Sequence, residues 1–346
     1  MSRRLLFAVW LAAWALGAQA QEDWRRVAVP TYTPAHFVLG QVQGWYSPRA
    51  AALARQALDL EAALAHGCPA DGPEEARLAW RRSVAAWARL SAVAVGPLNE
   101  RRSQRRIDFL PIRPARIAEA VAAPGQDLEL AGVAARGFGA LEWLLWAAPQ
   151  DAAHCAYALR LAGEIRAEAQ ALEQAFAARP ALLQEDEALV AAMNESLNQW
   201  LGGVEMLRLQ WLVKPLGDMQ QRGRPAPLLP RQFADQDAAA PGAASREERQ
   251  LRWESLQELL VGTAVPAPGQ DLVSVATYLR GKGLNPLADR LLAQARLADQ
   301  ALEQAGDGPA SLELAARRLA ELKALVENEV TPVLDIRVGF SDADGD

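Results

Sequence analysis

Long runs of alanine and leucine, interrupted by glycine and proline, constrain the fold of this chain more than any other feature. In 74–95, Trp80, Val84 and Trp87 fall four and three residues apart, the spacing of one face of a helix. No segment shows the alternation of apolar and polar residues that is typical of a strand. We therefore predict an all-α fold. Further helical patterns cover 51–65, 128–147, 152–178, 189–213, 246–261, 272–278, 287–304 and 310–330.

Glycine and proline predict where several of these helices end. Gly44 and Pro48 are expected to interrupt a helical pattern that starts at Phe37, and Pro215 is expected to end the helix of 189–213. The stretch 222–244 is rich in Pro, Gly, Ala and Asp and has no periodicity. We expect a long loop or a flap there.

The first twenty residues have the pattern of a secretory signal peptide. Arg3 and Arg4 precede an apolar run from Leu5 to Ala18, and Ala18 and Ala20 supply the small residues of a cleavage site. The run is too short for a membrane anchor. We predict export, cleavage near Ala20, and no transmembrane segment in the mature chain.

Charge and length suggest the kind of partner and the number of domains. The net charge of −6 argues against a nucleic-acid partner, which would require a clustered basic surface. The length favours two domains, and two short echoes, 87–98 with 205–216 and 140–146 with 255–261, suggest a duplication. We predict two related bundles of about four helices each, in 21–185 and 186–346.

Two cysteines, Cys68 and Cys155, each lie next to a histidine, His66 or His154. In an exported protein such a pair is most simply a disulfide. A Cys2His2 zinc site is the alternative, although neither cysteine has the close Cys-x-x-Cys spacing of such sites.

The stretch from Arg136 to Trp146 places one carboxylate, Glu142, among aromatic and leucine side chains. On a helix, Gly139, Glu142 and Trp143 share a side, so Glu142 should lie at the border of a core. A buried-edge carboxylate is most often paired with an arginine; the alternative is a ligand or metal pocket. Gly137 and Gly139 suggest a close backbone approach, a kink or a functional gap.

An irregular cationic segment, 101–114, holds five arginines and two prolines. It is either a solvated run of charge or a support that turns Arg106 and Arg113 inward to a carboxylate or an anionic ligand. At the other end of the chain, Asp342 and Asp344 could bind a hard cation such as calcium, or belong to a frayed acidic tail.

Four segments in order resemble the imelysin-like family, also called the insulin-cleaving membrane protease family. Gly137-Phe-Gly-Ala-Leu-Glu142 resembles its Gly-x-His-x-x-Glu motif, with Gly139 in place of the histidine. The other three are 80–98, which resembles its Trp-rich helix, 106–111, which resembles its Arg-Ile-x-Phe-Trp-Pro segment, and 338–346, which resembles its Gly-Phe-x-x-x-Asp-Gly-Asp ending.

The resemblance implies a periplasmic or surface-associated protein of two helical bundles with the motif near their interface. It also implies a link to iron acquisition or to metal-dependent peptidase activity. Without the histidine, Glu142 alone is a poor transition-metal site. The sequence does not identify the cofactor; the candidates are a divalent metal and iron.

Three functions therefore remain. The leading hypothesis is a ligand-binding or accessory component linked to iron acquisition, with an interface pocket around Gly137, Gly139, Glu142 and Trp143, joined by Arg106 and Arg113. In this hypothesis Gly139 opens space beside Glu142 for a small-molecule or metal ligand. The alternatives are a metal-dependent peptidase, for which the sequence shows no ligand cage, and a scaffold for an exported or membrane-associated protein partner.

Overall fold

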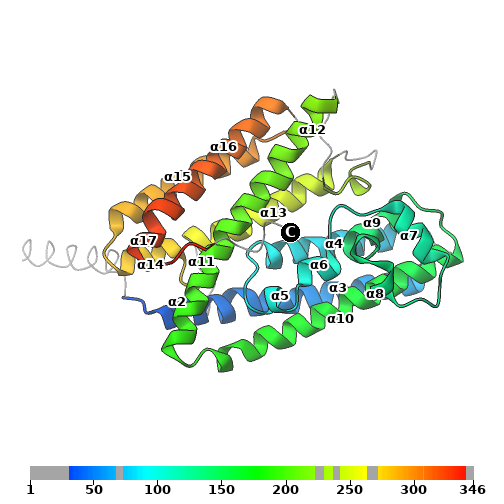
Figure 1. The fold of residues 1–346 in the computed structure, drawn as a ribbon, viewed down its shortest axis with the longest axis horizontal. Coiled ribbons are helices and arrows are strands. Elements are labelled where there is room, and N and C mark those ends of the chain that lie inside the picture. The colour runs from blue at the N-terminus through cyan, green and yellow to red at the C-terminus, as the bar shows by residue number, and fades with distance from the viewer. Residues whose placement is uncertain are drawn as a thin grey trace, which may run out of the picture.

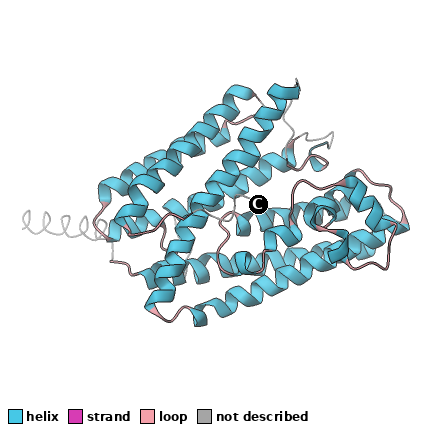
Figure 2. Ribbon diagram, in the orientation of Figure 1, coloured by secondary structure: helices cyan, strands magenta, loops and turns pink. Residues whose placement is uncertain are grey.

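The computed structural model describes residues 31–67, 73–222, 230–236, 242–262, 272–306 and 308–339. Within these ranges all regular elements are helical and there is no strand (Figure 2). The predicted all-α class is confirmed. The predicted signal peptide, 1–20, lies outside the described residues. None of the described helices combines the length and apolar character needed to cross a bilayer.

The first half of the chain forms a layer in which the long helices α3 and α4 pack side by side and α10 packs along α3 (Figure 1). Shorter elements connect α4 to α10. Among them α7, α8 and α9 lie at one end of this layer, and α9 carries Glu142 (Figure 1). In chain order, the elements of the first half are α2 (Pro34–Gln41), η1 (Val42–Tyr46), α3 (Ser47–Gly67), α4 (Glu74–Ser91), α5 (Pro97–Glu100), α6 (Ser103–Ile107), α7 (Pro114–Val121), α8 (Leu128–Ala131), η2 (Val133–Ala135), α9 (Gly137–Trp146) and α10 (Ala152–Leu182).

The second half is built around α11, α13, α15 and α16. Helix α15 packs against α16, and α16 packs against α11. The elements are α11 (Asp186–Arg208), η3 (Leu209–Val213), α12 (Lys214–Arg222), η4 (Ala234–Gln236), α13 (Ala243–Val261), α14 (Val275–Gly281), α15 (Asn285–Glu303), α16 (Pro309–Leu325), η5 (Val326–Val330) and α17 (Thr331–Val333).

Two helix pairs make the largest contacts between the halves. Helix α13 packs against α4 on one side and against α11 and α15 on the other, and α2 packs against α11. The buried apolar side chains of both halves belong to one continuous core. A division near residue 185 coincides with the turn between α10 and α11, and the two-domain description stays a prediction.

Three π-helical turns explain why prolines that were expected to break helices do not do so. In η1, η3 and η5 the backbone N–H of the next residue, Ser47, Lys214 or Thr331, bonds to a carbonyl five residues earlier. Each of these residues directly precedes a proline. Proline lacks an N–H and clashes with the carbonyl four residues back, and a wider turn accommodates it. The predicted interruptions at Pro48 and Pro215 are therefore wrong.

The single helix predicted for 128–147 is also wrong. The segment divides into α8, η2 and α9, with Gly132 and Gly137 at the two breaks. Their φ angles are +81° and +71°, values that only glycine adopts readily. Helix α9 therefore starts afresh at Gly137, which brings Glu142 within two turns of a helix N-terminus.

Candidate functional site

Helix α9 is held tightly against the segment that follows α6. A Cβ atom on Gly137 would collide with the Ile107 carbonyl, and one on Gly139 would lie 2.6 Å from Ile112 Cγ2. The two glycines thus permit close approach of backbone and side chain. The open space that was expected beside Gly139 is absent, because Ile112 and Leu110 fill it.

Glu142 is buried, with 1% of its surface exposed, and its carboxylate meets backbone amides from the second half of the chain. Oε1 accepts hydrogen bonds from Phe233 N at 2.8 Å and Ala234 N at 3.0 Å. Both donors belong to the turn that enters η4. The turn lies within the stretch that was predicted to be a loop or flap, and in the structure it is anchored to α9.

Burial raises the pKa of Glu142 to about 7, although the neighbouring Arg231 and the two backbone hydrogen bonds act to lower it. Asp235 raises it further by charge repulsion. A carboxyl group in this position is therefore partly protonated at neutral pH. Glu142 was expected to pair with an arginine. Arg231 attracts its carboxylate by charge, but the hydrogen bonds of the carboxylate come from backbone amides.

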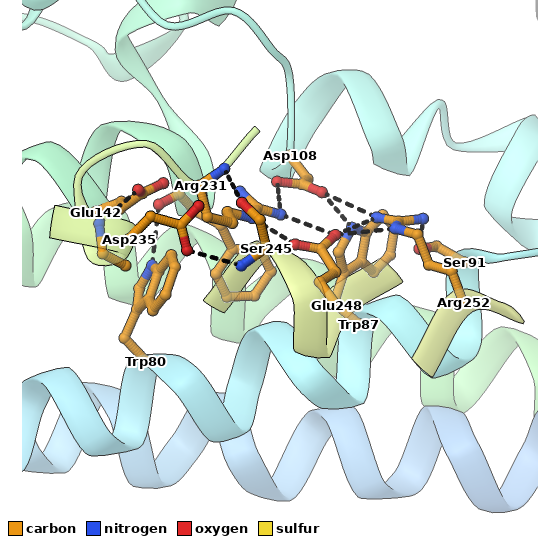
Figure 3. Close-up of polar contacts among 12 residues, drawn as sticks. Trp80, Trp87, Ser91, Asp108, Glu142, Arg231, Asp235, Ser245, Glu248 and Arg252 are labelled. Carbon is orange, nitrogen blue, oxygen red and sulfur yellow. Dashed lines mark hydrogen bonds and ion pairs between the residues drawn. The ribbon is translucent and has the colours of Figure 1, made fainter. Parts of the chain in front are cut away.

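Arg231 lies at the centre of a buried ionic cluster next to Glu142 (Figure 3). None of its surface is exposed. Its Nη2 donates to Asp108 Oδ1 at 2.8 Å, and its Nε donates to Glu248 Oε2 at 2.5 Å. Burial acts to lower the pKa of Arg231, but Asp108 and Glu248 raise it above its ordinary value. The guanidinium is therefore permanently charged.

The cluster is closed by Arg252, one helical turn after Glu248 on α13. Arg252 Nη2 lies 2.7 Å from Glu248 Oε1 and 3.5 Å from Asp108 Oδ2. Trp87 Nε1 donates to Asp108 Oδ2 at 2.8 Å. Burial raises the pKa of Asp108, whereas Arg231 and Arg252 outweigh burial and lower the pKa of Glu248. Two cations and two anions thus balance inside the junction of α4 with α13.

The other predicted site residues lie apart from this cluster. The ion pairs of Arg106 are with Glu168 at 3.6 Å and Glu129 at 4.0 Å. Arg113 is exposed at the start of α7. Trp143 is half-buried, and its ring centroid lies 6.3 Å from that of His154. Within the described residues, no contact joins Arg106 or Arg113 to Glu142.

The residues around Glu142 do not form a metal site. The described part of the chain has no group of three or more His, Cys, Asp or Glu side chains placed to hold an ion. Glu142 is already hydrogen bonded and stands beside a cation, so the donor set does not fit the metal implied by the family motif. Asp342 and Asp344 lie outside the described residues.

The predicted disulfide cannot be placed within the described residues. Cys155 is buried near the start of α10, and Cys68 lies outside the described ranges. The Cys68–Cys155 bond stays a prediction.

Sequence reasoning missed four residues of the cluster: Asp108, Arg231, Glu248 and Arg252. The spacing of Glu248 and Arg252 by four residues does indicate a helical ion pair, but it does not indicate burial. Arg231 follows Pro230 in a stretch without periodicity, and no local signal marks it.

These features define an all-helical protein whose two halves meet at a buried, charge-balanced junction. The imelysin family model (Peptidase_M75) matches residues 46–331. The chain belongs to the imelysin family.

Two solved structures share this fold. An imelysin-like protein from Psychrobacter arcticus 273-4 has 22% sequence identity and a TM-score of 0.71, over 90% of this chain and 100% of that one. A putative iron-regulated protein A precursor from Parabacteroides distasonis ATCC 8503 has 14% identity and a TM-score of 0.69, over 87% and 95% of the two chains. No curated protein matches the chain.

Proposed function

We propose that this chain is an exported, non-catalytic binding component of the imelysin family that serves in metal (iron) acquisition. The observation that carries the proposal is the commitment of Glu142 to Phe233 N and Ala234 N. Both bonds fall on Oε1, and the side chain is buried beside Arg231 with no group of metal-ligating side chains among the described residues, so Glu142 is poorly placed to ligate a metal or to activate a water molecule. Export and the link to iron rest on the predicted signal peptide and on the name of the Parabacteroides distasonis relative, an iron-regulated protein A precursor.

The chemistry of the junction also indicates the form of the cargo. The described residues supply no cage for a bare ion, and the groups nearest Glu142 include the cation Arg231. An iron-linked role therefore fits a cargo that carries its own metal-holding groups, such as an organic chelate, better than it fits a free ion.

Equilibrium dialysis of the mature protein against bare Fe(II) without oxygen, against ferric citrate and against haem tests this proposal. We expect at least one of the two organic complexes to be retained and the bare ion to pass through. Glu142→Gln should leave the metal content of the protein unchanged. Stoichiometric retention of bare iron that is lost in Glu142→Gln would contradict the proposal.

The peptidase alternative predicts a different result. Cleavage of casein that is abolished both by a chelator and by Glu142→Gln would favour it, and we expect no cleavage above that of a buffer control. The scaffold alternative predicts neither cargo nor cleavage.

A further inference from the structure

A crevice opens between α4 and α13 beside Arg231. Its walls are Trp80, Val84 and Ala85 from α4, and Ala244 and Leu251 from α13, with Arg231 contributing to the lining. Arg81, Glu247 and Glu248 also line it; Glu247 is exposed and Glu248 is buried. The free space measures about 10 Å³, room for about one oxygen-sized group.

Arg231 has one guanidinium nitrogen that the protein does not satisfy. Its Nε and Nη2 are bonded to Glu248 and Asp108, whereas Nη1 is buried and has no hydrogen-bond partner among the described residues. A buried donor without a partner is destabilising, because it has lost its hydrogen bonds to water. Because Arg231 both lines the crevice and has this unsatisfied edge, an acceptor that enters the crevice would meet a fully desolvated donor.

The charges of the cluster select the kind of acceptor. Arg231 and Arg252 are already matched by Asp108 and Glu248 at 2.5–3.5 Å. A further full negative charge would therefore stand beside two buried carboxylates. A neutral carbonyl oxygen satisfies the Nη1 donor without adding charge.

The walls select the group that carries this oxygen. The guanidinium carbon of Arg231 lies 5.8 Å from the centroid of the Trp80 ring, and Trp80 Nε1 is already bonded to the Phe138 carbonyl. The indole therefore presents an apolar surface with its polar edge satisfied. Val84, Ala85 and Leu251 add aliphatic surface. The free space admits about one oxygen-sized group, so the carbonyl oxygen of a flat, uncharged amide would enter while its apolar faces lie against the walls at the opening.

We propose that the crevice between α4 and α13 is a subsite for an uncharged peptide-type amide, whose carbonyl oxygen accepts a hydrogen bond from Arg231 Nη1. It is distinct from the contact of Glu142 with 233–234, and it does not depend on the role in iron acquisition. A buried water at Nη1 is the competing occupant.

Arginine side-chain ¹⁵N NMR of the mature protein, titrated with N-methylacetamide, tests the proposal. We expect the amide to cause saturable shifts of the buried guanidinium signals. Acetate and methylammonium at the same concentration should leave these signals unchanged. Ala85→Leu fills the crevice and should weaken the amide response at least tenfold. Ala86→Leu, the neighbouring half-buried alanine that does not line the crevice, is the matched control and should preserve it.

Three outcomes would overturn the proposal. One is a lack of response to the amide, which would leave water as the occupant. Another is a response to acetate equal to or stronger than that to the amide. The third is an unchanged amide response in Ala85→Leu, provided that thermal unfolding shows both variants to be folded. Both substitutions lie outside the ionic cluster, so the result does not rest on a variant that removes a buried charge.

Discussion

Two of the junctions between the halves of the molecule have opposite character. Between α4 and α13, Asp108, Arg231, Glu248 and Arg252 form a charged cluster. Between α2 and α11 the buried polar contact is neutral, from Ser196 Oγ to Gln41 Oε1 at 2.7 Å, amid apolar side chains. One of these contacts therefore depends on charge and the other on packing. Substitutions and pH should affect the two junctions differently.

The largest effect is expected from Arg231→Met. It leaves Asp108 and Glu248 buried with only Arg252 to offset them, and breaking a buried pair in this way costs about 3–5 kcal/mol. We expect the free energy of unfolding in urea to fall by that amount at pH 7. Arg231→Lys, which retains the charge but not the fork geometry, should lose less. Equal losses in the two variants would show that charge does not stabilise this junction.

The pH dependence should come next in size. The folded-state pKa of Glu142, about 7, is above the ordinary value of 4.5, so the folded protein binds more protons than the unfolded chain between these values. The stabilisation is full below about pH 4.5 and is lost as the pH rises through about 7. We expect a loss of about 3 kcal/mol.

Glu142→Gln isolates this dependence, because its amide oxygen can accept the same two backbone hydrogen bonds without titrating. Urea unfolding from pH 5 to pH 8 should show the wild type losing stability relative to the variant. Parallel curves for the two proteins would contradict the assigned pKa shift.

Val42→Ala tests the neutral junction. Val42 is buried on η1, and removing two methyl groups should cost about 2 kcal/mol through lost burial and a cavity. Unlike the effect of Glu142, this loss should be the same at pH 5 and pH 8. A loss that varies with pH would show that the neutral junction is linked to a titrating group.

The smallest effect is expected at Gly139. In Gly139→Ala the new Cβ would lie 2.6 Å from Ile112 Cγ2, and overpacking should cost about 1–2 kcal/mol. Ile112→Leu in the same chain removes this Cγ2 methyl and should recover part of the loss. Gly217→Ala in α12 is the control, because no atom lies within 4 Å of its Cβ, and it should be neutral or stabilising by about 0.5–1 kcal/mol. Similar destabilisation by Gly139→Ala and Gly217→Ala would show that the loss comes from placing alanine in a helix and not from contact with Ile112.

Much of the helical layout could be predicted from the sequence, since the apolar spacing of Trp80, Val84 and Trp87 reports a local property. The π-helical turns could not, because Pro48 and Pro215 normally end helices and the wider turn is stable only when packing supports it. Glu142 could be identified as unusual, but its partners could not. They are backbone amides of residues 91 and 92 positions away, and backbone groups leave no mark in a sequence.

The state of the Glu142 carboxyl tests the central claim most directly. The claim is that this group is engaged by Phe233 N and Ala234 N and is not a metal ligand. ¹³C NMR of the glutamate carboxyl carbons, assigned with Glu142→Gln and titrated without metal, should show a midpoint near pH 7. The midpoint should not move when Zn(II) or Fe(II) is added. A midpoint near the ordinary glutamate value, or one that metal lowers, would contradict the account.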